Sequence, residues 1–222
     1  RRHYRSRNAV MAIVGNVDTQ ETLERVRFWF SDVPDAGEPV PRVTAEMPSP
    51  VQGALGLLED DVEERTLWLV WQAVPLQHVD EPAIDVMVNV LSNGRGTRLD
   101  DALYYESKLA GQVGMFAPMS ELSGQIIAVV GSDKTALTKL EKKVRKEVEM
   151  LVKKPPTDQE LARARTAIRG WMLDEWEEPA DVASVLVDCY RSTGEAACLA
   201  KKWARYETVT SADVVRVAQK YL

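Results

Sequence analysis

The chain has 222 residues, 45% of them hydrophobic, which is enough to bury a substantial core as one large domain or as a domain plus a fragment. Its net charge of -6 argues against a nucleic-acid-binding protein, which normally presents a basic face. No apolar run approaches the roughly 20 residues that span a bilayer, so we expect no membrane span. The chain opens on Arg1-Arg2-His3-Tyr4-Arg5 rather than on a signal peptide, a start typical of the middle of a longer protein.

The first 33 residues predict a strand, a turn and a helix. Residues 9–15 form a short apolar run that ends at Gly15-Asn16, which is typical of a buried strand. Asp18 and Glu21 have the spacing of a capping box at the start of a helix. The helix that follows carries its apolar side chains at helical spacing, at Leu23, Val26, Phe30 and Val33.

Residues 34–50 are rich in proline and predict an extended, semi-rigid linker. Proline removes a backbone donor and disfavours helix at the residue before it. We therefore expect a domain boundary here, with residues 37–52 as the linker. The prolines of this stretch are Pro34, Pro39, Pro41, Pro48 and Pro50.

Beyond the linker the chain predicts strands. The apolar segments 53–58 and 65–73 are separated by the acidic residues 59–64, which we interpret as a solvated hairpin turn rather than a calcium site. In the second segment apolar residues occupy both alternating sets of positions, so the strand is expected to be covered on both faces. Two further strands are expected at residues 110–117 and 125–131.

The remaining pattern is mostly helical. Pro82 is suited to the first turn of a helix that ends near Asn93-Gly94, and a short helix is expected over residues 98–107. An apolar stripe over residues 137–151 predicts a helix that ends at Pro155-Pro156. A capping box at residues 157–160 starts the next helix, and three shorter helices follow. Strands first and helices after predict an α+β fold, an antiparallel sheet backed by helices.

The two cysteines, Cys189 and Cys198, leave two alternatives open. They lie nine positions apart around a predicted helix and turn, so a disulfide can form between them. We favour buried free thiols. The cysteines therefore do not decide between periplasm and cytoplasm.

Five segments, in this order along the chain, resemble motifs of the insulinase/pitrilysin family of zinc peptidases, which includes the mitochondrial processing peptidases. Residues 4–18 (YRSRNAVMAIVGNVD) resemble Y-x-x-x-N-A-x-x-x-x-x-G-D-V-D, with Asn16 at a usual Asp position. Residues 28–34 (FWFSDVP) resemble Y-F-G-x-I-P, and residues 91–99 (LSNGRGTRL) resemble L-G-G-G-x-x-S-R-L. Residues 156–164 (PTDQELARA) resemble P-x-T-x-x-E-L-x-x-A, and residues 209–222 (VTSADVVRVAQKYL) resemble V-T-x-x-D-V-x-x-V-A-x-K-Y-L.

The resemblance implies a domain organisation. In this family two similar α+β domains close like a clamshell around a peptide, and the first carries H-x-x-E-H, which binds zinc and supplies a general base. By this resemblance residues 1–36 are the strand–helix tail of the preceding domain. Residues 53–222 are then a non-catalytic peptidase-like domain of a bacterial-style protease.

The histidines exclude a catalytic zinc site in this chain. There are only two, His3 and His78, and they lie 75 positions apart. The segment from His78 begins like the zinc motif, but Pro82 stands where the second histidine would be. We interpret His78 as a solvated loop residue and expect the chain to bind no cofactor, with zinc in a catalytic partner.

The family's second domain contributes an arginine and a tyrosine to the substrate from a segment like L-R-E-x-x-G-L-A-Y. The matching segment here is residues 103–111 (LYYESKLAG). Tyr104 stands at the arginine position and Gly111 at the tyrosine position, so both are substituted. Arg98, in the S-R-L match, is retained, and we expect it to bond backbone or carboxylates at a helix start.

The resemblance therefore predicts a non-catalytic domain that completes the peptide-substrate chamber of an H-x-x-E-H-bearing domain or subunit. The alternative is a purely structural or assembly subunit that cleaves nothing, which the substituted pair favours. An extended peptide can pair with the edge of such a sheet. We also expect residues 9–15 to pair with this sheet, either within the chain or in a swapped homodimer.

Overall fold

The computed structural model describes residues 4–34, 40, 53–196 and 198–222. The chain divides into two compact units, Arg1–Ala45 with Trp171–Lys201 and Glu46–Gly170 with Lys202–Leu222. The predicted linker, residues 37–52, falls almost wholly outside the described residues. None of the described helices is long and apolar enough to cross a membrane.

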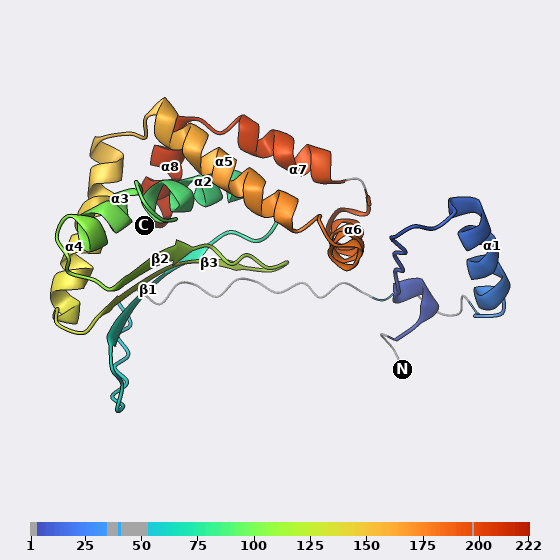
Figure 1. The fold of residues 1–222 in the computed structure, drawn as a ribbon, viewed down its shortest axis with the longest axis horizontal. Coiled ribbons are helices and arrows are strands. Elements are labelled where there is room, and N and C mark those ends of the chain that lie inside the picture. Colours follow the sequence, from blue (N-terminus) through green and yellow to red (C-terminus); the bar gives the residue numbers. More distant parts are fainter. Residues whose placement is uncertain (1–3, 35–39, 41–52, 197) are drawn as a thin grey trace. The chain divides into compact units, whose positions relative to one another are not determined.

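The second unit contains an antiparallel sheet of three strands in the order β1-β3-β2. The strands are β1 (Arg65–Ala73), β2 (Gln112–Phe116) and β3 (Gly124–Ser132). Helices gather on one side of this sheet (Figure 1). The predicted α+β fold with an antiparallel sheet backed by helices is therefore confirmed.

The helices of the second unit begin and end close to the predicted signals. They are α2 (Glu81–Leu91), α3 (Arg98–Asp100), the π-helical turn η2 (Asp101–Tyr105), α4 (Leu137–Lys153) and α8 (Ser211–Tyr221). Pro82 lies in the first turn of α2, as predicted. Thr210 caps α8 in a capping box with Asp213.

Two further helices, α5 (Asp158–Asp174) and α7 (Cys198–Glu207), contribute residues to both units. The predicted capping box of α5 is present, because Glu160 N–H donates to Thr157 Oγ1 and Thr157 N–H donates to Glu160 Oε2.

The core of the second unit lies between the sheet and its helices. Each layer contributes a completely buried side chain, namely Ile84 of α2, Ile126 of β3 and Leu140 of α4. The predicted stripe of α4 supplies the other buried side chains of that helix. Nine of the eleven residues of α2 are buried, which makes it the central helix of this unit.

The first unit has little core among its described residues. It contains the short 3-10 turn η1 (Ser6–Asn8), α1 (Thr19–Phe30) and α6 (Pro179–Thr193). Asp18 caps α1 by accepting from the Glu21 N–H, but Glu21 pairs with Arg25. No residue of α1 is buried, and Cys189 is the one buried residue of α6.

Two predicted strands do not form. Residues 9–15 contain no strand and are mostly exposed, so the buried strand predicted for this segment is wrong. Residues 54–58 are likewise irregular, with Leu55 and Leu58 more than nine-tenths exposed. A strand requires a hydrogen-bonded neighbour, and neither segment has one among the described strands.

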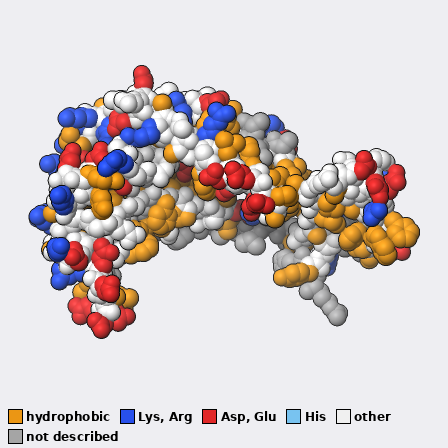
Figure 2. Space-filling model, viewed as in Figure 1, with side chains coloured by type: hydrophobic (Ala, Val, Ile, Leu, Met, Phe, Trp, Pro, Cys, Tyr) orange, Lys and Arg blue, Asp and Glu red, His pale blue; other side chains and the backbone are white. Residues whose placement is uncertain are grey.

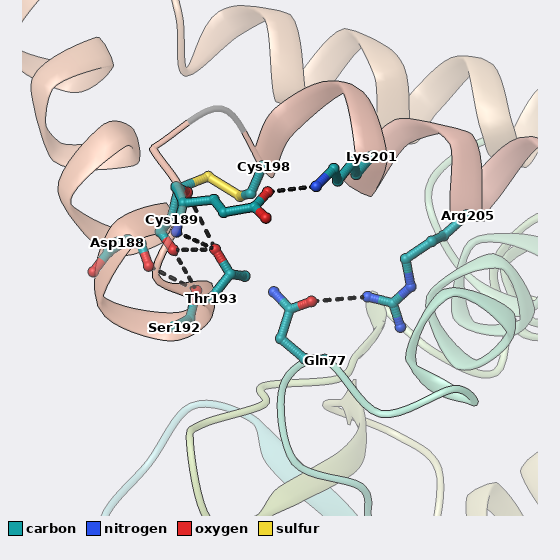
Figure 3. Close-up of a disulfide and its surroundings, with 9 residues drawn as sticks. Gln77, Asp188, Cys189, Ser192, Thr193, Cys198, Lys201 and Arg205 are labelled. Carbon is teal, nitrogen blue, oxygen red and sulfur yellow. Dashed lines mark hydrogen bonds and ion pairs between the residues drawn. A yellow bond between two sulfur atoms is a disulfide. The ribbon is translucent and has the colours of Figure 1, made fainter.

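The two cysteines form a disulfide, so the expectation of free thiols is wrong. Helix α6 ends at Gly194, whose φ of 77° allows the chain to turn back sharply. The turn places Cys198 at the start of α7 with its Cα 5.6 Å from that of Cys189, within the range of a disulfide. Thr193 lies beside the disulfide and donates to the Cys189 carbonyl (Figure 3).

Candidate functional site

The sheet of the second unit has one covered face and one open face. Strand register places Leu69 of β1, Ala128 of β3 and Met115 of β2 on one rung of the face that packs against the helices. The alternate residues point to the opposite face. There Trp68, Val129 and Gly114 form one rung, and Val70, Ile127 and Phe116 form the next.

The open face is apolar and accessible. Trp68 is 58% exposed, Val70 54% and Phe116 44%. The prediction that β1 is covered on both faces is therefore wrong for the described residues. Local alternation in β1 identified two apolar faces correctly, but it carries no information on whether a second layer is present.

Carboxylates gather at one end of this face, in the segment before β1. Figure 2 shows acidic side chains at the tip of the loop that precedes the strand. Glu59, Asp60, Asp61 and Glu63 are exposed there, and Glu64 is half-buried. The segment contains bends at Asp61, Glu63 and Glu64, and because residues 54–58 form no strand, the predicted hairpin is not formed, although most of these side chains are exposed to solvent.

Arg98 lies away from the open face and joins two helices. Its guanidinium donates to both carboxylate oxygens of Glu160, at 2.7 and 3.1 Å, and to the carbonyl of Lys154 at 2.8 Å. The hydrogen bond from Arg98 lowers the pKa of Glu160 to about 2. Arg98 thereby ties the end of α4 to the start of α5.

Tyr104 and Gly111 lie at two ends of one short connection. Tyr104 is in η2, 46% exposed, with its ring 4.9 Å from that of Tyr105. Gly111 precedes β2 and donates its N–H to the Gly131 carbonyl. The backbone N–H groups of Leu109 and Ala110 both donate to the Leu103 carbonyl, which folds the connection back on η2.

A buried carboxylate cluster at the start of α2 has no counterpart in the sequence-based predictions. Asp80 is 2% exposed and accepts from Arg216 at 2.6 Å, Tyr221 at 2.7 Å and Lys220 at 3.1 Å. Burial raises the pKa of Asp80, but the hydrogen bonds from Tyr221, Arg216 and Lys220 outweigh it and keep the pKa well below its ordinary value. Asp80 therefore anchors α8 to α2.

The next two carboxylates of α2 face α7. Glu81 accepts from Arg205 at 2.9 Å, and Asp85 accepts from the Tyr206 hydroxyl at 2.7 Å. Burial raises the pKa of Asp85 to about 6, despite the opposing hydrogen bond from Tyr206. The one available sequence signal was the set of acidic residues at the start of an otherwise apolar helix.

The residues around His78 do not suit a zinc ion. His78 is half-buried rather than solvated, and its Nδ1 accepts from the Asp80 N–H. The nearby carboxylates of Asp80 and Glu81 are already engaged by cations. No group of three or more potential ligands gathers within the part of the chain that the structure describes.

These features define an α+β domain with an open apolar sheet face and without the histidine pair of a self-sufficient zinc peptidase. Residues 1–168 match the family model of the peptidase M16 inactive domain, and the chain belongs to this family. The insulinase/pitrilysin resemblance is thereby confirmed. As the inactive domain of such peptidases the chain is not catalytic by itself, and it implies a catalytic partner domain.

Proteins similar to this chain include bacterial proteases. The zinc protease PqqE of Helicobacter pylori is 23% identical over 225 residues, which cover 99% of this chain and 50% of that protein. A protease from Helicobacter pylori has a similar structure, with a TM-score of 0.78 and 22% identity over 94% of this chain and 50% of its own.

A peptidase M16 inactive domain from Pseudomonas fluorescens gives a TM-score of 0.74 and 18% identity, covering 92% of this chain and 48% of that one. The chain thus spans about half the length of the curated relatives that it matches.

Proposed function

We propose that this domain forms one wall of a peptide-binding chamber and that an H-x-x-E-H-bearing zinc domain, in the same protein or in an adjacent subunit, forms the other. The observation that carries the proposal is the open apolar face of the sheet. Trp68 and Val70 of β1 and Phe116 of β2 are 44–58% exposed on this face, on either side of the central strand β3. Such a surface stabilises a bound chain by removing apolar area from water.

Strand edges add a second way to bind an extended peptide. Among the described strands, β1 and β2 each pair on one side only, with β3. Unpaired backbone groups at an edge can accept a further strand. The domain therefore offers backbone hydrogen bonds at an edge together with apolar contacts on a face.

The test uses the protein that contains both the catalytic half and this domain. Trp68→Ala is compared with Trp171→Ala, because Trp171 is similarly exposed, at 61%, but lies on α5. We expect Trp68→Ala to raise KM for peptides about tenfold or more, with zinc content unchanged and Trp171→Ala close to wild type. If the two halves form a stable complex but Trp68→Ala leaves KM for peptides unchanged, the purely structural role is supported instead.

We further propose that residues 1–36 belong structurally to the preceding, catalytic domain. Phe28 and Trp29 of α1 are 74% and 73% exposed, so the apolar side of this segment lacks cover among the described residues. Phe28→Asp is expected to weaken association of the two halves when they are produced as separate chains. Unchanged association, measured by calorimetry, would contradict this assignment.

A homodimer of the 222-residue chain is the competing proposal for residues 9–15. In it this extended segment pairs with the sheet of a second copy. Light scattering distinguishes the two proposals, since a monomer at all concentrations would exclude the dimer.

At the two substituted family positions we propose no direct catalytic contribution. Tyr104→Phe is expected to leave turnover in the two-domain protein within about twofold of wild type, because the phenol is partly exposed and has no assigned part in binding.

A further inference from the structure

One carboxylate of the acidic segment differs from the others in its position. Glu64 directly precedes β1, and its carboxylate lies over Gly131 at the end of the open face and close to Gly111, which directly precedes β2. A Cβ atom at Gly131 would lie 2.5 Å from Glu64 Oε1, and one at Gly111 would lie 3.3 Å from it. Two adjacent positions without side chains therefore make room for this carboxylate on the sheet.

The Glu64 carboxylate has no hydrogen bond or ion pair with any described residue. Its neighbours in sequence add negative charge, since Glu59, Asp60, Asp61 and Glu63 are all exposed. The first cation that follows Glu64 in the sequence is Arg65, and strand alternation places it with the helix-covered set of positions. The end of the open face is therefore anionic and unneutralised among the described residues.

The carboxylate and the apolar surface share one axis along the strands. Gly131 pairs with Thr66 and Gln112, and the next two rungs carry Trp68 and then Val70 with Phe116. Rungs on one face of a sheet are about 7 Å apart along the strand, the length of two extended residues. The distance from the anionic end to the apolar rungs thus corresponds to about two to four residues of an extended peptide.

We propose that Glu64 is an anionic subsite that binds the Lys or Arg side chain of an extended peptide, while a large apolar side chain two to four residues away lies on Trp68, Val70 and Phe116. The occupant follows from complementarity of charge at one end and of apolar surface at the other. The inference rests on the proposed peptide-binding function and adds a preference for basic–apolar sequences to it.

The test measures binding of paired fluorescent peptides to the two-domain protein by anisotropy. The peptides carry one Trp or Leu and differ only in Lys or Gln two or four residues away. We expect the Lys peptide to bind about two- to fivefold more tightly than the Gln peptide at low salt. At high salt the two affinities should become nearly equal.

Three variants assign the preference to position rather than to overall charge. Glu64→Gln is expected to abolish it, whereas Glu63→Gln, which removes an exposed carboxylate, is expected to retain it. Gly131→Ala keeps the charge but forces the flexible Glu64 carboxylate to move, so the preference should fall while the thermal midpoint stays close to wild type.

Two outcomes overturn the inference in distinguishable ways. If both peptides bind equally and Glu64→Gln changes nothing, Glu64 is not a subsite, although the peptide-binding function stands. If neither peptide binds and Trp68→Ala has no effect on cleavage, the proposed function itself fails and the subsite with it.

Discussion

The two units of the chain are stabilised in different ways. In the larger unit α2 buries nine of its eleven residues and is bonded to α7 and α8 by buried carboxylates. In the smaller unit α1 buries none of its twelve residues, and α6 buries only a disulfide-bonded cysteine. Both sets of helices carry ordinary helical signals, so helix formation alone does not make a stable unit. The smaller unit exposes apolar surface that suits a further partner.

The largest expected effect tests this contrast with one substitution made at two sites. Leu91→Ala in α2 removes a completely buried side chain, and we expect a loss of about 2–5 kcal/mol in the free energy of unfolding. Leu23→Ala in α1, where the leucine is 44% exposed, should change it by less than about 0.5 kcal/mol. Urea denaturation of the 222-residue chain measures both, and equal losses would show that α1 has a core of its own.

The next effect concerns the polar anchor of α2. Arg205→Met leaves the buried Glu81 carboxylate without its cation, and we expect a loss of about 2–3 kcal/mol. Arg145→Met removes an exposed pair with Glu141 on α4 and should cost less than about 0.5 kcal/mol. If Arg205→Met lowered the free energy of unfolding as little as Arg145→Met does, the larger unit would be held by apolar packing alone.

The disulfide provides the corresponding test in the smaller unit. Closing a loop of nine positions contributes about 2–3 kcal/mol in the chain-entropy account. The double variant Cys189→Ser/Cys198→Ser should therefore speed amide hydrogen exchange in α6 but leave exchange in α2 unchanged. A disulfide of this kind forms in oxidising compartments, so the native protein is expected to resist thiol-specific labels. Accelerated exchange in α2 as well would show that the two units unfold together.

The sequence predicted features that depend on neighbouring residues and missed those that depend on distant ones. The start of α5 follows from Thr157 and Glu160, three residues apart, and the apolar stripe of α4 repeats within each turn. By contrast, Asp80 and Tyr221 are 141 residues apart, and no local pattern indicates their contact. The candidate site shows the same division, because alternation in β1 predicted two apolar faces but not which one lacks a cover.

The smallest expected effect is a pH dependence within α2. Burial raises the pKa of Asp85 to about 6 from an ordinary value of 3.8, with further contributions from Tyr206, Glu81, Lys202 and Arg205. Between these values the folded chain holds a proton that the unfolded chain has released. The contribution of Asp85 to stability is therefore complete below about pH 4 and is lost as the pH rises through 6.

Replacing Asp85 with Asn removes this loss while keeping an oxygen that accepts from the Tyr206 hydroxyl. We expect Asp85→Asn to unfold with a free energy about 1–3 kcal/mol above wild type at pH 7 and close to wild type at pH 4, measured by urea denaturation at each pH. Glu160 has the opposite dependence, since its lowered pKa makes its contribution complete above about pH 4.5 and lost as the pH falls toward 2. If the difference in the free energy of unfolding between Asp85→Asn and wild type stayed constant from pH 4 to 7, the pKa of Asp85 would be close to its ordinary value. The buried carboxylates of α2 would then all act as anionic anchors.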